Sequence, residues 1–194
     1  MKNSTAIVIL VVVLLLFVGG CNSYNSFVAK NEVVNTEWAK VQSAYQRRAD
    51  LIPNLVNTVK GYADFEKSTL TQVINARAKA TSINIDANNL TPEAMQKFQS
   101  AQTGLTSALK SLLVTVERYP DLKANKNFLE LQAQLEGTEN RIKVARDKYN
   151  EAVRNYNTSI KKFPANLYST ILGFKPKPYF EADKGSEKAP EVKF

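Results

Sequence analysis

Histidine is absent from the 194-residue sequence, and cysteine occurs once, as Cys21. The lack of an imidazole excludes a Ser-His-Asp triad, a Cys-His pair, an imidazole general base and a zinc site with nitrogen ligands. A single thiol excludes an internal disulfide, a thiolate metal cluster and a CxxC redox pair. The sequence therefore offers no catalytic residue, no metal ligands and no cofactor site, and we expect a protein that is not an enzyme.

Glycine and proline are also scarce, with 7 of each in the chain. Alanine, glutamine, lysine, leucine and asparagine dominate the middle of the sequence, and this composition favours helices over a sandwich or a barrel. The length fits one domain once a targeting segment is subtracted. We therefore expect an all-α protein with one helical domain.

Basic residues outnumber acidic ones, 26 against 18, which gives a formal net charge of +8. The two signs are interspersed and no RNA-binding or DNA-binding motif occurs, so nucleic acid is not an expected partner. Attraction to an anionic membrane surface is a better use of this charge, at up to about 1 kcal/mol for each well-placed Lys or Arg. Surface solubility is the alternative explanation.

The N-terminal segment, residues 1–21, is the long hydrophobic run of the sequence. Every one of the 13 positions from Ala6 to Val18 is apolar, and Lys2 is the only charge before Lys30. As a helix that extends to Cys21, this run measures roughly 24 Å, which is shorter than the ~30 Å hydrocarbon core of a bilayer. The same length also fits the apolar part of an export signal. The segment is therefore predicted to direct the chain to a membrane.

Cys21 separates two interpretations of this segment. The tetrad VGGC that ends at Cys21 resembles the bacterial lipobox, in which the cysteine is acylated and becomes the mature N-terminus. The alternative is an uncleaved transmembrane helix in which Cys21 is a small apolar residue, and ordinary signal cleavage is the third choice. Both leading interpretations leave Lys2 inside and place the remaining domain outside the cytoplasm, in the cell envelope.

The body of the chain, residues 22–174, begins with apolar residues at alternating steps of four and three. The stripe contains Val34, Trp38, Val41, Tyr45, Ile52, Leu55, Val59 and Tyr62. This heptad spacing predicts a long helix with one buried face. Proline at position 53 lacks a backbone donor and clashes with the carbonyl of residue 49, so we expect a kink there rather than an end. Arg48 interrupts the stripe one turn before the kink.

The firmest helix boundary lies at Thr91, a good N-cap residue, followed by Pro92 at the first helical position. Helical spacing then continues until Pro120 stops it. The last long helix keeps its frame over about 35 residues until Pro164, which makes it about 50 Å long. Such a helix cannot bury its stripe alone, so it needs partners of comparable length, and the long first helix is one that can serve.

After Pro164 a short helix is predicted, with Gly173 at its C-terminal cap. Residues 175–194 mix charge with proline and are expected to form a disordered tail. The periodicity therefore predicts a bundle of about four long helices between a membrane segment and this tail.

The sequence YQRRADLIPNLVNTVKGYADFEKSTLTQVINARAKA, from Tyr45 to Ala80, is similar to the most recognisable segment of the LemA family. Later segments, among them RYP at 118–120, NYN at 155–157 and the break at Phe163-Pro164, continue the resemblance over nearly the whole chain. The resemblance implies a bacterial protein with an N-terminal membrane segment followed by an antiparallel bundle of long helices, which agrees with the helical spacing above. It implies no established activity, but an association with the cell envelope and neighbouring membrane proteins.

One position departs from the family resemblance. Many members carry histidine before the glutamate of the Gly-Tyr-Ala segment, whereas this chain has Phe65 before Glu66. Any catalysis or metal binding by that histidine is therefore excluded here.

Polar residues recur beside the Pro53 turn on one face of the first helix. The predicted partner-binding residues are Gln46, Arg47, Arg48, Asp50, Asn54, Asn57 and Lys60. Amides and one carboxylate between two guanidiniums could bind a polar head group, a peptidoglycan fragment or a helix of another protein. In the plainer interpretation Arg47 pairs with Asp50, and the amides satisfy backbone groups that Pro53 leaves free.

Three functional hypotheses follow from these observations. The first is a non-enzymatic, membrane-tethered scaffold whose partner is an envelope or membrane protein. The second is an envelope enzyme that uses Arg, Asp and Glu beside Pro53, which requires a deep pocket at Arg48 lined by Asp50 and Glu66. The third is a domain that binds anionic membrane surfaces. Because heptad stripes can pair helices within one chain or between chains, the sequence is compatible with a monomer and with a homo-oligomer.

Overall fold

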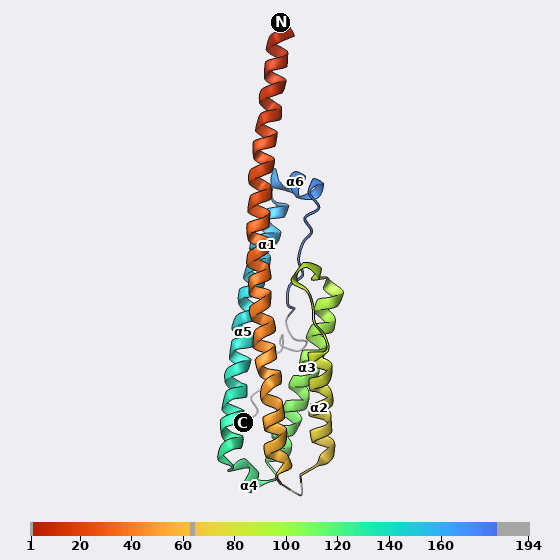
Figure 1. Ribbon diagram of the computed structural model, residues 1–194, viewed down its shortest axis with the longest axis vertical. Coiled ribbons are helices and arrows are strands. Elements are labelled where there is room, and N and C mark those ends of the chain that lie inside the picture. Colours follow the sequence, from red (N-terminus) through yellow and green to blue (C-terminus); the bar gives the residue numbers. More distant parts are fainter. Residues whose placement is uncertain (1, 63–64, 182–194) are drawn as a thin grey trace, which may run out of the picture.

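The computed structural model describes residues 2–62 and 65–181, which form a bundle of long helices without a strand among them (Figure 1). Helix α1 spans Lys2–Lys60 and packs along the antiparallel helix α5, Lys126–Lys161. Helices α2, Lys67–Thr81, and α3, Pro92–Val116, form a shorter hairpin beside this pair. The prediction of an all-α bundle of about four long helices is confirmed.

Short elements connect the long helices. The 3-10 helix η1, Ala87–Asn89, lies between α2 and α3, and α4, Pro120–Lys123, lies between α3 and α5. The expected start of α3 is confirmed, because the Thr91 side chain accepts a hydrogen bond from the backbone N of Ala94 at 3.2 Å. A short helix follows α5 as expected: α6 spans Ala165–Ile171. Gly173, two residues after its end, has a positive φ of 76°, which suits glycine after a helix C-terminus.

Helix α1 continues through Pro53, as predicted, and it ends at Lys60. Proline has no N–H to donate to the carbonyl of Ala49, and Ala49 is buried. The guanidinium Nε of Arg77 in α2 donates to that carbonyl at 2.8 Å. The expectation that amides of α1 satisfy the freed backbone group is therefore wrong, since a cation from the neighbouring helix satisfies it.

The apolar interior has two parts. The upper core, toward α6 in Figure 1, contains the aromatic residues Phe27, Trp38, Tyr45, Phe98, Tyr149, Tyr156 and Phe180. The lower core, toward α4, contains Ile52, Leu55, Val59, Val73, Leu105, Leu112, Leu122 and Phe128. The predicted stripe of α1 lies in these two cores, and its last member, Tyr62, is half-buried.

The segment after α6 packs against the bundle. Hydroxyls of Tyr149 and Tyr156 donate to the carbonyls of Pro178 and Lys175, at 2.9 and 3.1 Å, and Phe180 is buried in the upper core. The expectation of a disordered tail is therefore wrong for residues 175–181, and its remaining part, 182–194, lies outside the described residues. Because the α2–α3 hairpin is shorter than α5, this segment covers apolar surface of α1 and α5 that the hairpin leaves open.

The N-terminal part of α1 extends beyond the other helices (Figure 1). Its large apolar side chains are exposed, and by length and composition this part is able to cross a membrane, a test that a signal sequence near the N-terminus also passes. The helix passes the expected boundary at Cys21 without a break.

Candidate functional site

Six of the predicted partner-binding residues are exposed on α1: Gln46, Arg47, Asp50, Asn54, Asn57 and Lys60. Asp50 accepts a hydrogen bond from the Gln46 amide at 2.7 Å. The plainer interpretation expected Asp50 to pair with Arg47. Among the described residues, Asp50 instead contacts the side-chain amide of Gln46, which is one helical turn before it. The structure places these side chains on the outside of the bundle, and whether they bind a partner stays a prediction.

Arg48 is the exception, because its side chain is only 1% exposed and lies between the upper and lower cores. Position 48 belongs to the buried stripe, three residues after Tyr45 and four before Ile52, so the helix directs it inward. The prediction that Arg48 contributes to a partner-binding surface is wrong in this structure.

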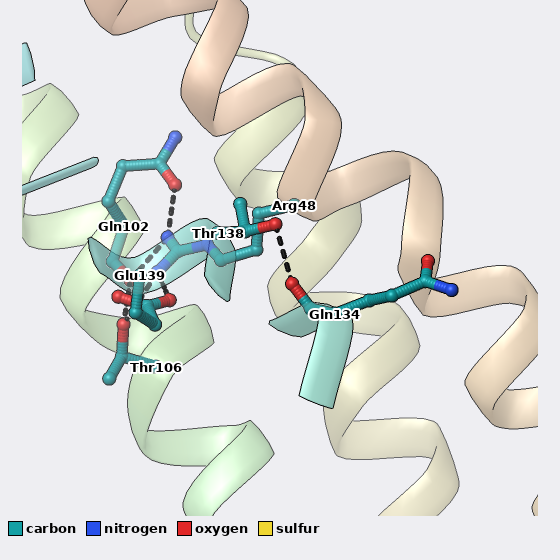
Figure 2. A network of polar contacts seen from close by, with 6 residues as sticks. All are labelled: Arg48, Gln102, Thr106, Gln134, Thr138 and Glu139. Carbon is teal, nitrogen blue, oxygen red and sulfur yellow. Dashed lines mark hydrogen bonds and ion pairs between the residues drawn. The ribbon is translucent and has the colours of Figure 1, made fainter. Parts of the chain in front are cut away.

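The Arg48 guanidinium joins helices α1, α3 and α5 (Figure 2). Its Nη1 donates to Glu139 Oε1 at 2.6 Å and to Thr106 Oγ1 at 3.0 Å. Its Nη2 donates to the amide oxygen of Gln102 at 2.7 Å, and the Gln102 amide nitrogen donates to the Ala80 carbonyl at the end of α2, at 3.3 Å. One polar layer therefore connects all four long helices.

The two ends of this layer differ in exposure. Glu139 is 46% exposed, whereas Gln102 is buried, and Arg48 Nε has no hydrogen-bond partner among the described residues. The charged carbon of Arg48 also lies 5.1 Å from the centre of the Tyr45 ring, which favours the cation. Removing a charge from water costs several kcal/mol, so this layer fixes helix register more than it stabilises the fold.

Sequence reasoning identified Arg48 as a break in the stripe but missed the residues that receive it, namely Gln102, Thr106 and Glu139. A signal was present in α5, where Thr138 occupies a stripe position and is buried beside Glu139. A polar residue within the apolar stripe of one helix predicts a polar residue at the same level along the bundle axis in a neighbouring helix.

An open groove of about 1390 Å³ runs beside the exposed face of α1. Three predicted residues, Gln46, Arg47 and Asp50, line it, whereas Asn54, Asn57 and Lys60 are not among its lining residues. The groove also receives the basic side chains Lys40, Arg141 and Lys148. Both α1 and α5 thus contribute positive charge to one elongated depression.

Glu37 and Asp50 are the acidic residues that line this groove. Lys40 pairs with Glu37 Oε1 at 2.6 Å, while Glu37 Oε2 is buried with no hydrogen-bond partner among the described residues. Lys40 remains more than half exposed, so it still presents charge to the groove.

The pocket required by the enzyme hypothesis is not formed by its three residues. Arg48 is in the interior, Asp50 is on the surface, and Glu66 pairs with Arg118 at 2.7 Å near the α4 end of the bundle. Within residues 2–62 and 65–181, no three acidic, cysteine or histidine side chains gather as metal ligands would.

Shifted pKa values occur near the segment that follows α6. Burial raises the pKa of the Tyr149 and Tyr156 hydroxyls above their ordinary value. Burial lowers the pKa of Lys177, partly opposed by the charges of Glu32 and Asp86. These groups hold the segment in place, since Lys177 Nζ also donates to the Ala87 carbonyl at 2.7 Å.

The lipidation candidate Cys21 is exposed on α1, next to two glycines that contact α6. A Cβ atom added at Gly19 would lie 3.1 Å from the Tyr168 hydroxyl oxygen, and one added at Gly20 would lie 3.3 Å from a carbon of the Tyr168 ring. The small residues of the VGGC tetrad therefore allow α6 to lie close to α1. Acylation of Cys21 stays a prediction.

Comparison with known proteins gives relatives that match about four fifths of this chain. Two magnetosome proteins of Paramagnetospirillum magneticum, MamQ 1 and MamQ 2, are each 27% identical to this chain over 179 aligned residues, which cover 81% of this chain and 64% of the relative. Protein LemA of Metamycoplasma hominis is 26% identical over 155 residues, covering 80% of this chain and 67% of its own length. This chain thus spans less than two thirds of the MamQ relatives. Residues 37–194 match the LemA family, and the chain belongs to that family.

Proposed function

We propose that the protein is a non-enzymatic, membrane-tethered interaction module of the bacterial cell envelope, with its helical bundle outside the cytoplasm. The apolar start of α1 supports the tether, and the positive charge of Lys2 before the apolar run supports the orientation, because positive residues that flank a membrane segment tend to stay inside. The names of the relatives attach no reaction to the family.

The observation that carries this proposal is the groove to which α1 and α5 both contribute basic residues. Arg47 and Arg141 are exposed, come from different helices and line the same groove with Lys40 and Lys148. A groove of this kind suits an acidic, extended or helical segment of another protein, because charge complementarity steers and orients such a partner.

The rigid helix also sets the height at which that partner binds. Arg47 is 29 residues after Val18, which corresponds to roughly 44 Å along a helix that rises about 1.5 Å per residue. The partner is therefore an envelope or membrane protein with an acidic segment well above the bilayer surface, rather than a headgroup.

Crosslinking in cells tests this proposal. A photoreactive amino acid at position 47 is expected to join the full-length protein to a reproducible neighbour, and the same group at Lys110, an exposed α3 position outside the groove, is expected not to. The variant Arg47→Glu/Arg141→Glu should lose a crosslink made from position 43, a further groove residue. Equal products from positions 47 and 110, or a charge-reversed variant that keeps its crosslink, would show that the groove is not the interface.

A further inference from the structure

The outer face of α6 is unusually apolar for a surface helix. Phe163, just before the helix, is 81% exposed, and Leu167 and Ile171 are 56% and 82% exposed. Leu167 and Ile171 are four residues apart in α6, so they lie along one side of the helix, and Phe163 is an exposed aromatic residue two positions before its start. The opposite side carries Ser169, which is buried and donates to the Ile160 carbonyl at 2.8 Å. The more apolar side of α6 therefore faces away from the protein.

Contacts with α1 fix the height of α6. Tyr168 lies against Gly19 and Gly20, the two residues that follow the apolar run. Figure 1 shows α6 lying across the long axis of α1, at the point where α1 leaves the bundle. The exposed side chains of α6 are therefore level with the end of the membrane-directed segment.

Positive charge surrounds this apolar face. Lys161 and Lys162 precede α6 and Lys175 follows it, and all three are exposed. The sequence contains no acidic residue from 152 to 180. An apolar face between basic residues is typical of an element that lies in a membrane interface, with cations at anionic headgroups and apolar side chains about 5–10 Å deeper.

We propose that α6 is a second membrane contact, which inserts Phe163, Leu167 and Ile171 into the interface of an anionic bilayer. Its flanking lysines bind lipid phosphates. With α1 as the first contact, α6 fixes the orientation of the bundle relative to the bilayer.

The assignment holds for either anchor at the N-terminus. An uncleaved run from Ala6 to Val18 measures roughly 20 Å as a helix, so a ~30 Å hydrocarbon core extends past Val18 toward the residues that contact α6. Acylation of Cys21 would make it the mature N-terminus and remove Gly19 and Gly20, and the acyl chains would then enter the bilayer from the first residue of the remaining helix, close to the height of α6. In both cases the apolar side of α6 meets the acyl boundary.

Quenching by brominated lipids tests this contact in the full-length protein. Leu167→Trp adds an indole to the outer face of α6, and Val114→Trp adds one to α3 as the control, at a position 72% exposed. In vesicles of phosphatidylcholine and phosphatidylglycerol, bromines near the top of the acyl chains should reduce the emission added at position 167 at least twofold. Emission added at position 114 should not change. The native Trp38 is buried in the upper core and gives the same background in both.

A second variant separates insertion from mere proximity. Phe163→Ser/Ile171→Ser in the Leu167→Trp background should lower the quenching, and vesicles without phosphatidylglycerol should lower it further because the lysines lose their anionic partners. The substituted positions are exposed, so helicity should be unchanged. Unquenched emission at position 167 would overturn the proposal. So would emission that shifts only with the protein-to-lipid ratio, since that result identifies a second copy of the chain as the occupant.

Discussion

Removing Glu139 should destabilise the bundle more than removing Arg48, although Arg48 is the buried partner of the pair. In Glu139→Ala, the guanidinium stays 1% exposed with its neutral acceptors but without a countercharge. Breaking a buried ion pair in this way costs about 3–5 kcal/mol. Because the Glu139 site is half open to water, we expect the lower end of that range, about 3 kcal/mol.

In Arg48→Met, the charge that remains is the one that water can reach. Glu139 is 46% exposed and can be hydrated again without leaving its place. The main loss of stability comes from the buried amide oxygen of Gln102, which no longer receives a hydrogen bond. An unsatisfied buried acceptor lowers the free energy of unfolding by about 1–3 kcal/mol. The apolar methionine offsets part of this cost, so we expect a loss of about 1 kcal/mol.

Urea unfolding followed by tryptophan fluorescence measures this difference. Trp38 is the single tryptophan and is fully buried against Phe98, Tyr149 and Phe180, so its emission follows the bundle rather than the apolar start of α1. Arg47→Met is the matched control, exposed and expected to change stability by less than about 0.5 kcal/mol. If Arg48→Met lowers the free energy of unfolding more than Glu139→Ala does, this prediction is refuted. That result would mean that the contacts of the guanidinium stabilise the fold by more than the burial of its charge destabilises it.

Three further predictions concern other contacts. Arg77→Met should cost about 1–3 kcal/mol by leaving the Ala49 carbonyl without a donor, and the added change Pro53→Ala should recover much of it by restoring the helical N–H, as a double-mutant cycle would show. Tyr149 has a raised pKa in the folded state, so its stabilising effect is complete below pH 10.0 and declines above it by about 1.4 kcal/mol per pH unit; the stability gap to Tyr149→Phe should narrow over that range in urea titrations. Phe180→Ala should cost about 3–5 kcal/mol and expose the segment after α6 to limited proteolysis, whereas a disordered segment would show neither effect.

Heptad spacing predicted the helices well because long apolar stripes need long partners. Trp38 and Leu55 are buried as the spacing requires, and the Thr91 cap begins α3. The segment after Lys175 was predicted poorly. Its burial depends on apolar surface of α1 and α5 that the short α2–α3 hairpin leaves uncovered, and the composition of the segment gives no information about that surface. Its apolar anchor, Phe180, is a single residue without periodicity.

The candidate site was predicted in part. Local spacing found the exposed face that includes Gln46 and Arg47, since a helix places residues four apart on one side. The same spacing could not assign Arg48 to the interior, because its burial depends on acceptors that are 54 to 91 residues away in sequence. Nor could it place α6 beside the two glycines, a contact made by Tyr168 near the other end of the chain.

The packing of Phe180 against Trp38 has a consequence for the order in which the molecule is completed during synthesis. Residues of the lower core are contained between Ile52 and Leu135, so this half can close while the ribosome is still extending the chain. The upper core needs Phe180, and thus nearly the whole polypeptide, before its aromatic cluster is sealed. The end of the bundle from which the apolar part of α1 extends is therefore the last to acquire its final structure, because it needs residues from both ends of the chain.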